Sequence, residues 1–193
     1  DYALLNNLSI ESDALLTLNE QAALTIKENV TNNGTFIMNS TIANSGSLIV
    51  EGTATGNLTY NRFVSTNWHL VSSPVIGQNY NDLWISDNDI KSSTSNVNRK
   101  ALGVYNNNAS WQYFLAGQSS VFNQGIGYTV SKANEGNITF SGNIATTSKN
   151  VAISSGSTNS YNLLGNIFEV EIKNKVWKSG DYRGAIFELI MSF

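Results

Sequence analysis

Apolar and polar residues alternate within three consecutive twelve-residue blocks near the start of the chain, at residues 24–35, 36–47 and 48–59. Each block opens with two apolar residues separated by one other residue, and a small or β-branched residue stands at its seventh position. The first two blocks end in Asn33-Gly34-Thr35 and Ser45-Gly46-Ser47, where glycine suits a tight turn. One short rung cannot bury its inward face alone, so a repeat of this kind predicts stacked β-rungs. We expect a β-solenoid of about three twelve-residue rungs, with an N-terminal cap, over residues 1–59.

The repeat is lost after residue 59, and short apolar runs bounded by turn residues follow. Such runs predict an antiparallel β-sandwich or jelly roll over residues 60–168. Residues 169–193 are richer in charge and end in the apolar run 185–193. That run predicts a final buried strand, the alternative being an exposed apolar tail that needs a partner. The predicted fold class is therefore all-β.

The composition limits the function. Charged residues make up 13% of the chain, the formal net charge is −3, and there is no cysteine. Nucleic-acid binding needs clustered Lys and Arg to displace phosphate counterions, so a nucleic-acid partner is not expected. Without cysteine the chain has neither disulfides nor thiolate metal sites. No apolar run is long enough to span a bilayer, so we expect no membrane insertion.

Catalytic residue types are sparse. His69 is the only histidine, which leaves no partner for a histidine-based metal site. The acidic residues show no spacing that selects a pair for glycoside hydrolysis. We therefore predict that the chain is not an enzyme.

Three acidic residues, Asp82, Asp87 and Asp89, lie close together in the sequence. Calcium takes oxygen ligands from carboxylates and carbonyls, so a structural Ca²⁺ is the one cofactor that the sequence suggests. The segment lacks the glycine and the distal glutamate of an EF-hand loop, which makes the signal weak. The alternative is a solvated polar turn.

Aromatic residues are the better candidates for ligand contacts. Trp111 and Tyr113 alternate on one predicted strand, and Tyr105 lies on its expected partner strand across an Asn-rich turn. A row of aromatic rings can stack on the apolar faces of sugars. The predicted ligand-binding residues, including nearby side chains that could form hydrogen bonds, are Trp84, Trp111, Tyr113, Tyr105, Asn107 and Gln112. The alternative is that these aromatic residues pack in the core, where we also expect Trp68.

Several stretches of the chain resemble a group of secreted proteins of the Bacteroidota that are exported by the type IX secretion system. The matching stretches are TNNGTF at 31–36, GSLIVEGTATG at 46–56, YNR at 60–62, WHLVSSP at 68–74 and YNLLGN at 161–166. Ile167 stands where the group usually has proline. Members of the group usually continue into a C-terminal sorting domain, which we do not expect residues 167–193 to form. The resemblance implies an extracellular or cell-surface location and carries over no catalytic residues.

Taken together, these features predict a non-catalytic, secreted cell-surface module for adhesion or assembly. Its expected partner is a polysaccharide, bound through exposed aromatic residues, or another cell-surface protein. One alternative is a carbohydrate-binding module of a polysaccharide-degrading enzyme. Another is a self-assembling filament or surface-layer subunit that associates through the solenoid edge or the apolar tail at 185–193.

Overall fold

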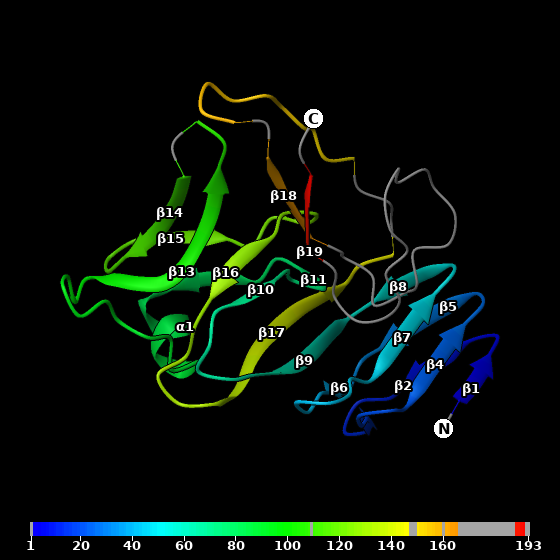
Figure 1. The fold of residues 1–193 in the computed structure, drawn as a ribbon. Helices are drawn as coiled ribbons and strands as arrows, with labels where there is room; N and C mark the ends of the chain where they lie inside the picture. The colour runs from blue at the N-terminus through cyan, green and yellow to red at the C-terminus, as the bar shows by residue number, and fades with distance from the viewer. Residues whose placement is uncertain (1, 109, 147–149, 160, 166–187, 192–193) are drawn as a thin grey trace.

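The structure is a computed structural model, and it describes every residue except 1, 109, 147–149, 160, 166–187 and 192–193. Residues 188–191 are described by their backbone alone. The described part contains nineteen β-strands and one short helix, which confirms the all-β prediction (Figure 1).

The N-terminal part forms parallel ladders. The first contains β1 (Tyr2–Leu5), β4 (Ala23–Ile26) and β7 (Ser47–Val50). The second contains β2 (Leu8–Ile10), β5 (Asn29–Asn32) and β8 (Thr53–Thr55). The third runs through β3 (Leu15–Leu18), β6 (Thr35–Asn39) and β9 (Asn57–Val64). Each pass of the chain thus contributes one strand to each ladder.

The predicted twelve-residue rung is wrong, because stacked strands do not pair residues that are twelve positions apart. Leu24 lies opposite Leu48 rather than Phe36, so the paired residues are twenty-four positions apart. Phe36 lies opposite Leu16 in the third ladder. The first two sequence blocks are therefore successive parts of one pass around the stack. Strands on different sides of a stack share the same apolar alternation, so the pattern alone does not distinguish them.

Strand β9 joins the parallel ladders to the rest of the molecule. It pairs in parallel with β6 on one side and antiparallel with β17 (Gly136–Ile144) on the other. The five-stranded sheet is completed by β11 (Val75–Ile76), which pairs with the far edge of β17. One sheet thus runs continuously through the boundary predicted at residue 59.

A second sheet has four antiparallel strands in the order β10 (His69–Val71), β16 (Tyr128–Val130), β13 (Arg99–Asn106) and β14 (Ser110–Leu115). Two small ribbons complete the described strands. They are β12 (Asn79–Asn81) with β15 (Ser119–Val121), and β18 (Asn162–Gly165) with β19 (Glu188–Met191). Strand β19 lies in the C-terminal segment for which a final strand is predicted. The rest of that segment lies outside the described residues.

The core is continuous between the two larger sheets. Phe122 contacts Phe140 of β17 and Tyr128 of β16, with ring centroids 5.2 and 4.8 Å apart. Helix α1 (Asp82–Asp87) adds Trp84, whose ring lies 5.0 Å from that of Phe122. Burial of large aromatic residues dominates the energetics of such a core. The same core supports the four-stranded sheet from one side, so the opposite face of that sheet is turned away from the core.

Asparagine side chains form a hydrogen-bonded ladder along the stack. The Asn39 amide donates to Asn19 Oδ1 (3.2 Å), and Asn61 donates to Asn39 Oδ1 (3.0 Å). Thr139 of β17 then donates its hydroxyl to Asn61 Oδ1 (3.0 Å). This chain of bonds continues from the parallel strands into the antiparallel part and gives the asparagine-rich composition a structural role.

Candidate functional site

The outer face of the β13–β14 hairpin carries a group of aromatic rings. Tyr105 and Trp111 are directly paired in the strand register, and their rings meet edge to face at 5.3 Å. Tyr113 follows Trp111 by two residues and therefore points to the same side of the strand. All three rings are half-buried. The prediction that Tyr105, Trp111 and Tyr113 share one face is confirmed.

Trp68 extends this aromatic group, although the sequence analysis places it in the core. Its side chain is 56% exposed, and its ring lies 5.7 Å from that of Tyr113. The core prediction is wrong because Trp68 precedes β10 and follows a bend at residues 66–67 rather than lying inside a strand. The Ser-Thr-Asn run just before it is the sequence signal that could have indicated an exposed position.

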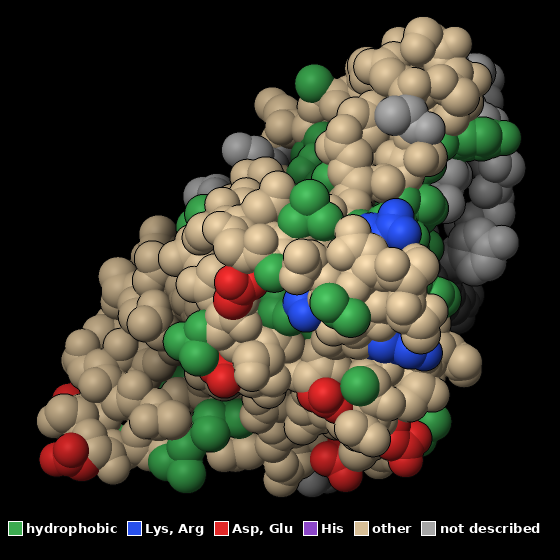
Figure 2. All heavy atoms as spheres, turned by 90° about the vertical axis from the view of Figure 1, so that its left-hand side faces the viewer, with side chains coloured by type: hydrophobic (Ala, Val, Ile, Leu, Met, Phe, Trp, Pro, Cys, Tyr) green, Lys and Arg blue, Asp and Glu red, His purple; other side chains and the backbone are tan. Residues whose placement is uncertain are grey.

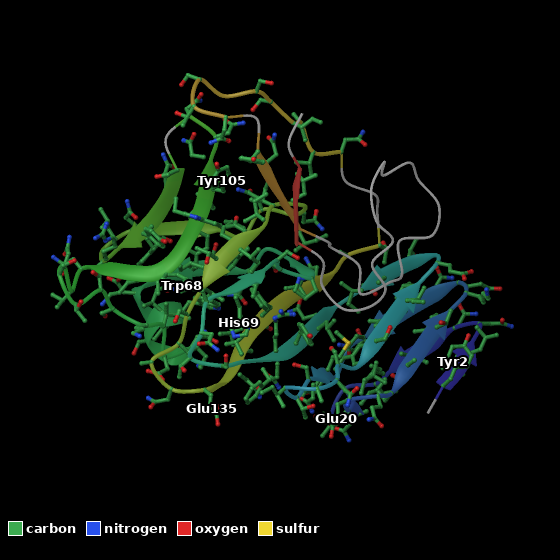
Figure 3. The ribbon with its side chains drawn as sticks, viewed as in Figure 1. Tyr2, Glu20, Trp68, His69, Tyr105 and Glu135 are labelled. Carbon is green, nitrogen blue, oxygen red and sulfur yellow. The ribbon has the colours of Figure 1, made fainter. Side chains whose placement is uncertain are left out.

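We refer to Trp68, Tyr113, Trp111 and Tyr105 as the aromatic face. Figure 3 shows Trp68 and Tyr105 on the part of the molecule that contains the hairpin, far from Tyr2 at the other end. The rings form two contacting pairs on this face, Trp68 with Tyr113 and Trp111 with Tyr105. The two pairs are joined through β14, in which Trp111 and Tyr113 are two residues apart and point to the same side.

A glycine sets the position of the central ring. Gly103 lies opposite Tyr113 in the register, and a Cβ atom at Gly103 would lie 3.0 Å from a ring carbon of Tyr113. The ring therefore lies directly over the Gly103 backbone. The Arg99 guanidinium lies 6.0 Å from the centre of the same ring, at the outer limit of a cation–π contact. Tyr113 is thus held between backbone, a cation and Trp68.

Gln112 does not lie beside these rings. It alternates with Trp111 and Tyr113 and pairs with Val104, so its side chain belongs to the opposite face of the hairpin. There it lines a cavity of about 560 Å³ together with residues of β12 and β15. The predicted grouping of Gln112 with the aromatic residues is therefore corrected by strand alternation.

Asn107 is also not part of the aromatic face. It is only 9% exposed, and its amide donates to the carbonyl (2.8 Å) and hydroxyl (3.2 Å) oxygens of Ser154. Its own carbonyl accepts the Asn159 N–H at 3.2 Å. Asn107 therefore fastens the segment around residues 154–159 to the hairpin turn, which corrects its predicted role as a ligand contact.

Trp84 is 7% exposed and belongs to the core, which removes it from the predicted ligand-binding set. Its indole N–H donates to the Thr139 carbonyl at 3.0 Å. Asn88, which follows α1, accepts the Thr139 N–H at 2.6 Å, and its amide donates to the Trp84 carbonyl at 2.8 Å. Helix α1 and its C-cap thus satisfy both backbone groups of Thr139 on the edge of β17.

Backbone groups on the same edge of β17 also form hydrogen bonds on both sides of Thr139. The Lys132 ammonium donates to the carbonyls of Asn137 (3.0 Å) and Asn88. The Ser141 N–H donates to Gln78 Oε1 at 2.6 Å. Burial lowers the pKa of Lys132, and the nearby Asp89 opposes this effect. Because an open strand edge recruits other strands, this covering protects β17 from pairing with another chain.

The three aspartates predicted as calcium ligands are not brought together as a cluster. Asp82 accepts the Gly117 N–H at 2.9 Å, and Asp89 accepts the backbone and side-chain N–H groups of Asn134. Asp87 ends α1 and is exposed. Within the described residues, no three His, Cys, Asp or Glu side chains form a group that could hold a metal ion.

His69 lies near the aromatic face without belonging to it. Its Nε2 atom accepts the Ser65 N–H at 3.0 Å, and the Ser65 hydroxyl lies 2.9 Å from the same atom. Burial lowers the pKa of His69, and the positive charge of Arg62 adds to this effect. Both contacts favour the neutral imidazole, so His69 acts as a structural acceptor.

Charge does not mark a site on the side of the molecule that carries the β13–β14 hairpin. Figure 2 shows acidic and basic side chains scattered over this surface, most of which consists of backbone and of side chains that are neither charged nor hydrophobic. The aromatic face, in which Trp68 is exposed and the three hairpin rings are half-buried, is therefore the feature that distinguishes this side of the hairpin.

No protein-family model, curated protein or solved structure matches the chain. The resemblance to secreted Bacteroidota proteins therefore stays a prediction. In the described part, no helix is long and apolar enough to cross a membrane.

Proposed function

We propose that this chain is a non-catalytic glycan-binding module, and that the aromatic face binds a polysaccharide. The observation that carries the proposal is a pair of ring contacts on one face, Tyr105 with Trp111 on the β13–β14 hairpin and Tyr113 of that hairpin with Trp68. Indole and phenol rings combine a flat apolar surface with a polar edge, which suits the alternating apolar faces and hydroxyl groups of sugars. The ligand class is a neutral polysaccharide.

The construction of the aromatic face supports the proposal. Trp68 is 56% exposed although tryptophan usually lies largely buried, and Gly103 leaves room for the Tyr113 ring to lie against the sheet. Both features favour a preformed surface, which lowers the entropy lost on binding. The charged side chains on this side of the molecule are few and of both signs, which gives little electrostatic preference for a charged ligand (Figure 2).

The finer architecture and the location belong to the same proposal. Residues 2–64 form a short three-sided β-solenoid, and the five- and four-stranded sheets form a β-sandwich that displays the aromatic face. The parallel registers and the aromatic contacts between the sheets support this arrangement. The module acts outside the cell in adhesion or cell-surface assembly, as the resemblance in the sequence implies.

The proposal is tested by screening the purified chain on a glycan array. We expect binding to at least one neutral polysaccharide and at least tenfold weaker binding for the Trp68→Ala and Trp111→Ala variants. Tyr2→Ala is the matched control, because Tyr2 is an exposed aromatic residue (67%) at the other end of the molecule. Equal losses in all three variants, or no binding by the folded wild type, would contradict the proposal.

One observation favours a second function, self-association through the N-terminal edge. Strands β1, β2 and β3 each lie at an outer position of their sheet, and this edge exposes Tyr2, Leu4 and Leu15 (67%, 52% and 64%). Open edges and exposed apolar side chains favour strand pairing between copies. Size-exclusion chromatography of the wild type and of Leu4→Lys tests this function. A concentration-independent monomer in both would refute it.

A further inference from the structure

The β13–β14 hairpin also borders a hollow on its opposite face. A cavity of about 560 Å³ opens between this hairpin and the β12–β15 ribbon. Its volume lies within the range of roughly 300–1,000 Å³ that is common for small-molecule sites. Strand alternation places it on the other side of the hairpin from the rings of Trp111 and Tyr105, because Gln112 lines it and alternates with Trp111. Gly103 and Tyr113 also line it, so the cavity and the aromatic face share this part of the hairpin.

One wall of the cavity is aromatic and fixed in place. The Tyr80 ring lies 5.9 Å from the rings of both Phe114 and Tyr128, and all three residues line the cavity. The back of this wall packs on the core, since Tyr80 also lies 4.7 Å from Phe122. Burial raises the pKa of Tyr128 to about 12, so its phenol stays neutral at physiological pH. The wall is therefore a rigid, uncharged ring surface.

The rim of the cavity is polar and carries no charged side chain. Exposed amides and hydroxyls surround it, from Gln112, Gln118, Ser119 and Ser120. Gln118 accepts the Leu115 N–H at 2.9 Å through its carbonyl oxygen, which leaves the amide NH₂ to face a ligand as a donor. None of the described residues that line the cavity is Asp, Glu, Lys, Arg or His.

These surfaces define the chemistry of an occupant. A ligand must be neutral, have an apolar face to lie on Tyr80, and carry several hydroxyl or amide groups around its edge for the rim. We propose that the cavity is a binding site for a single uncharged pyranose, either as a free monosaccharide or as the terminal residue of a glycan. This site goes beyond the proposed function, because it lies between the hairpin and the β12–β15 ribbon and is lined by neither Trp68 nor Trp111.

The test uses free D-glucose, D-galactose, D-mannose, L-fucose and N-acetyl-D-glucosamine, measured by ligand-observed NMR and calorimetry on the whole chain. We expect at least one sugar to bind. Gln112→Leu keeps the side-chain volume but removes the amide, and should weaken binding at least tenfold. Ser120→Phe places a ring at the exposed rim and should abolish it. Trp68→Ala should leave the affinity within twofold.

Three outcomes would overturn the proposal for the cavity. These are no binding of any sugar in the panel by the folded wild type, binding that survives both cavity variants, and binding that is lost in Trp68→Ala. Each variant is first checked for wild-type tryptophan fluorescence and thermal unfolding, so that misfolding does not imitate a loss of the site. Polysaccharide binding on the array that depends on Trp68 but not on Gln112 would support the aromatic face alone.

Discussion

The covering of the β17 edge by the C-cap of α1 predicts a large stability loss for Asn88→Ala. Asn88 is 4% exposed, and its side chain makes two hydrogen bonds, to the Thr139 N–H (2.6 Å) and to the Trp84 carbonyl (2.8 Å). The Trp84 carbonyl also accepts the backbone N–H of residue 88 at 3.1 Å, so it keeps one partner in the variant. The Thr139 N–H loses its acceptor at a partly buried position.

The magnitude follows from these two bonds. An unsatisfied buried donor costs about 1–3 kcal/mol, and the second bond contributes about 0.5–1.5 kcal/mol. We expect the free energy of unfolding to fall by about 2–3 kcal/mol, and the midpoint of thermal unfolding to fall by roughly 4–10 °C for a chain of this size. Urea unfolding followed by tryptophan fluorescence measures the change.

The control is Asn98→Ala at an exposed position, where we expect a change within about 0.5 kcal/mol. The Asn88→Ala variant should also aggregate more readily on heating, because it leaves the edge of β17 partly uncovered. A loss for Asn88→Ala no larger than that for Asn98→Ala would refute the reasoning that helix side chains satisfy this strand edge.

Three further predictions test other parts of the structure. Asn39→Ala interrupts the asparagine ladder and should lower the free energy of unfolding, measured in urea, by about 1–2 kcal/mol. The control Asn33→Ala, at an exposed position, should change it little. Equal effects of the two substitutions would show that the ladder does not contribute to stability. His69 has a folded-state pKa below its unfolded value, so it contributes stability that is present above about pH 6.5 and lost as the pH falls toward the folded pKa. In urea unfolding from about pH 7.5 to 5.5, the free energy of unfolding should fall with decreasing pH, and it should fall less steeply in His69→Gln. An equally steep fall in both proteins would contradict this prediction. Gly103→Ala should displace the Tyr113 ring and weaken glycan binding less than Trp68→Ala does, as measured on the same array; unchanged binding would show that the ring position is unimportant.

The positions of the N-terminal strands were predictable from the sequence, because the alternation of apolar and polar residues is a local property. The pairing of these strands was not predictable, because it depends on the path of the chain between them. Leu24, Phe36 and Leu48 occupy equivalent places in the repeat, yet only Leu24 and Leu48 stack. The choice depends on how the chain turns between β4, β5 and β6 within one pass. Phe36 begins the same apolar alternation on another side of the stack, so twelve-residue spacing describes two sides of one pass.

The aromatic candidates separate for an equally physical reason. Trp111, Tyr113 and Tyr105 were predicted together because a hairpin with a short turn determines which residues share a face. Trp84 was predicted to contact a ligand but lies in the core, and Trp68 was predicted in the core but is exposed. Both predictions failed because the surroundings of each residue depend on strands distant in the sequence. Trp84 finds a hydrogen-bond acceptor on Thr139, fifty-five residues away, and Trp68 finds a ring partner in Tyr113. Local composition around either tryptophan contains no information about those partners.

The central claim is that the aromatic face binds a glycan, and the indole N–H signals of the tryptophans test it most directly. The measurement is a ¹H–¹⁵N NMR titration with the polysaccharide that the array identifies, with signals assigned by single Trp→Phe variants. The signals of Trp68 and Trp111 should shift with saturation, while that of Trp84, bonded to Thr139 in the core, should stay unchanged. Saturable binding that leaves Trp68 and Trp111 unshifted would contradict the account.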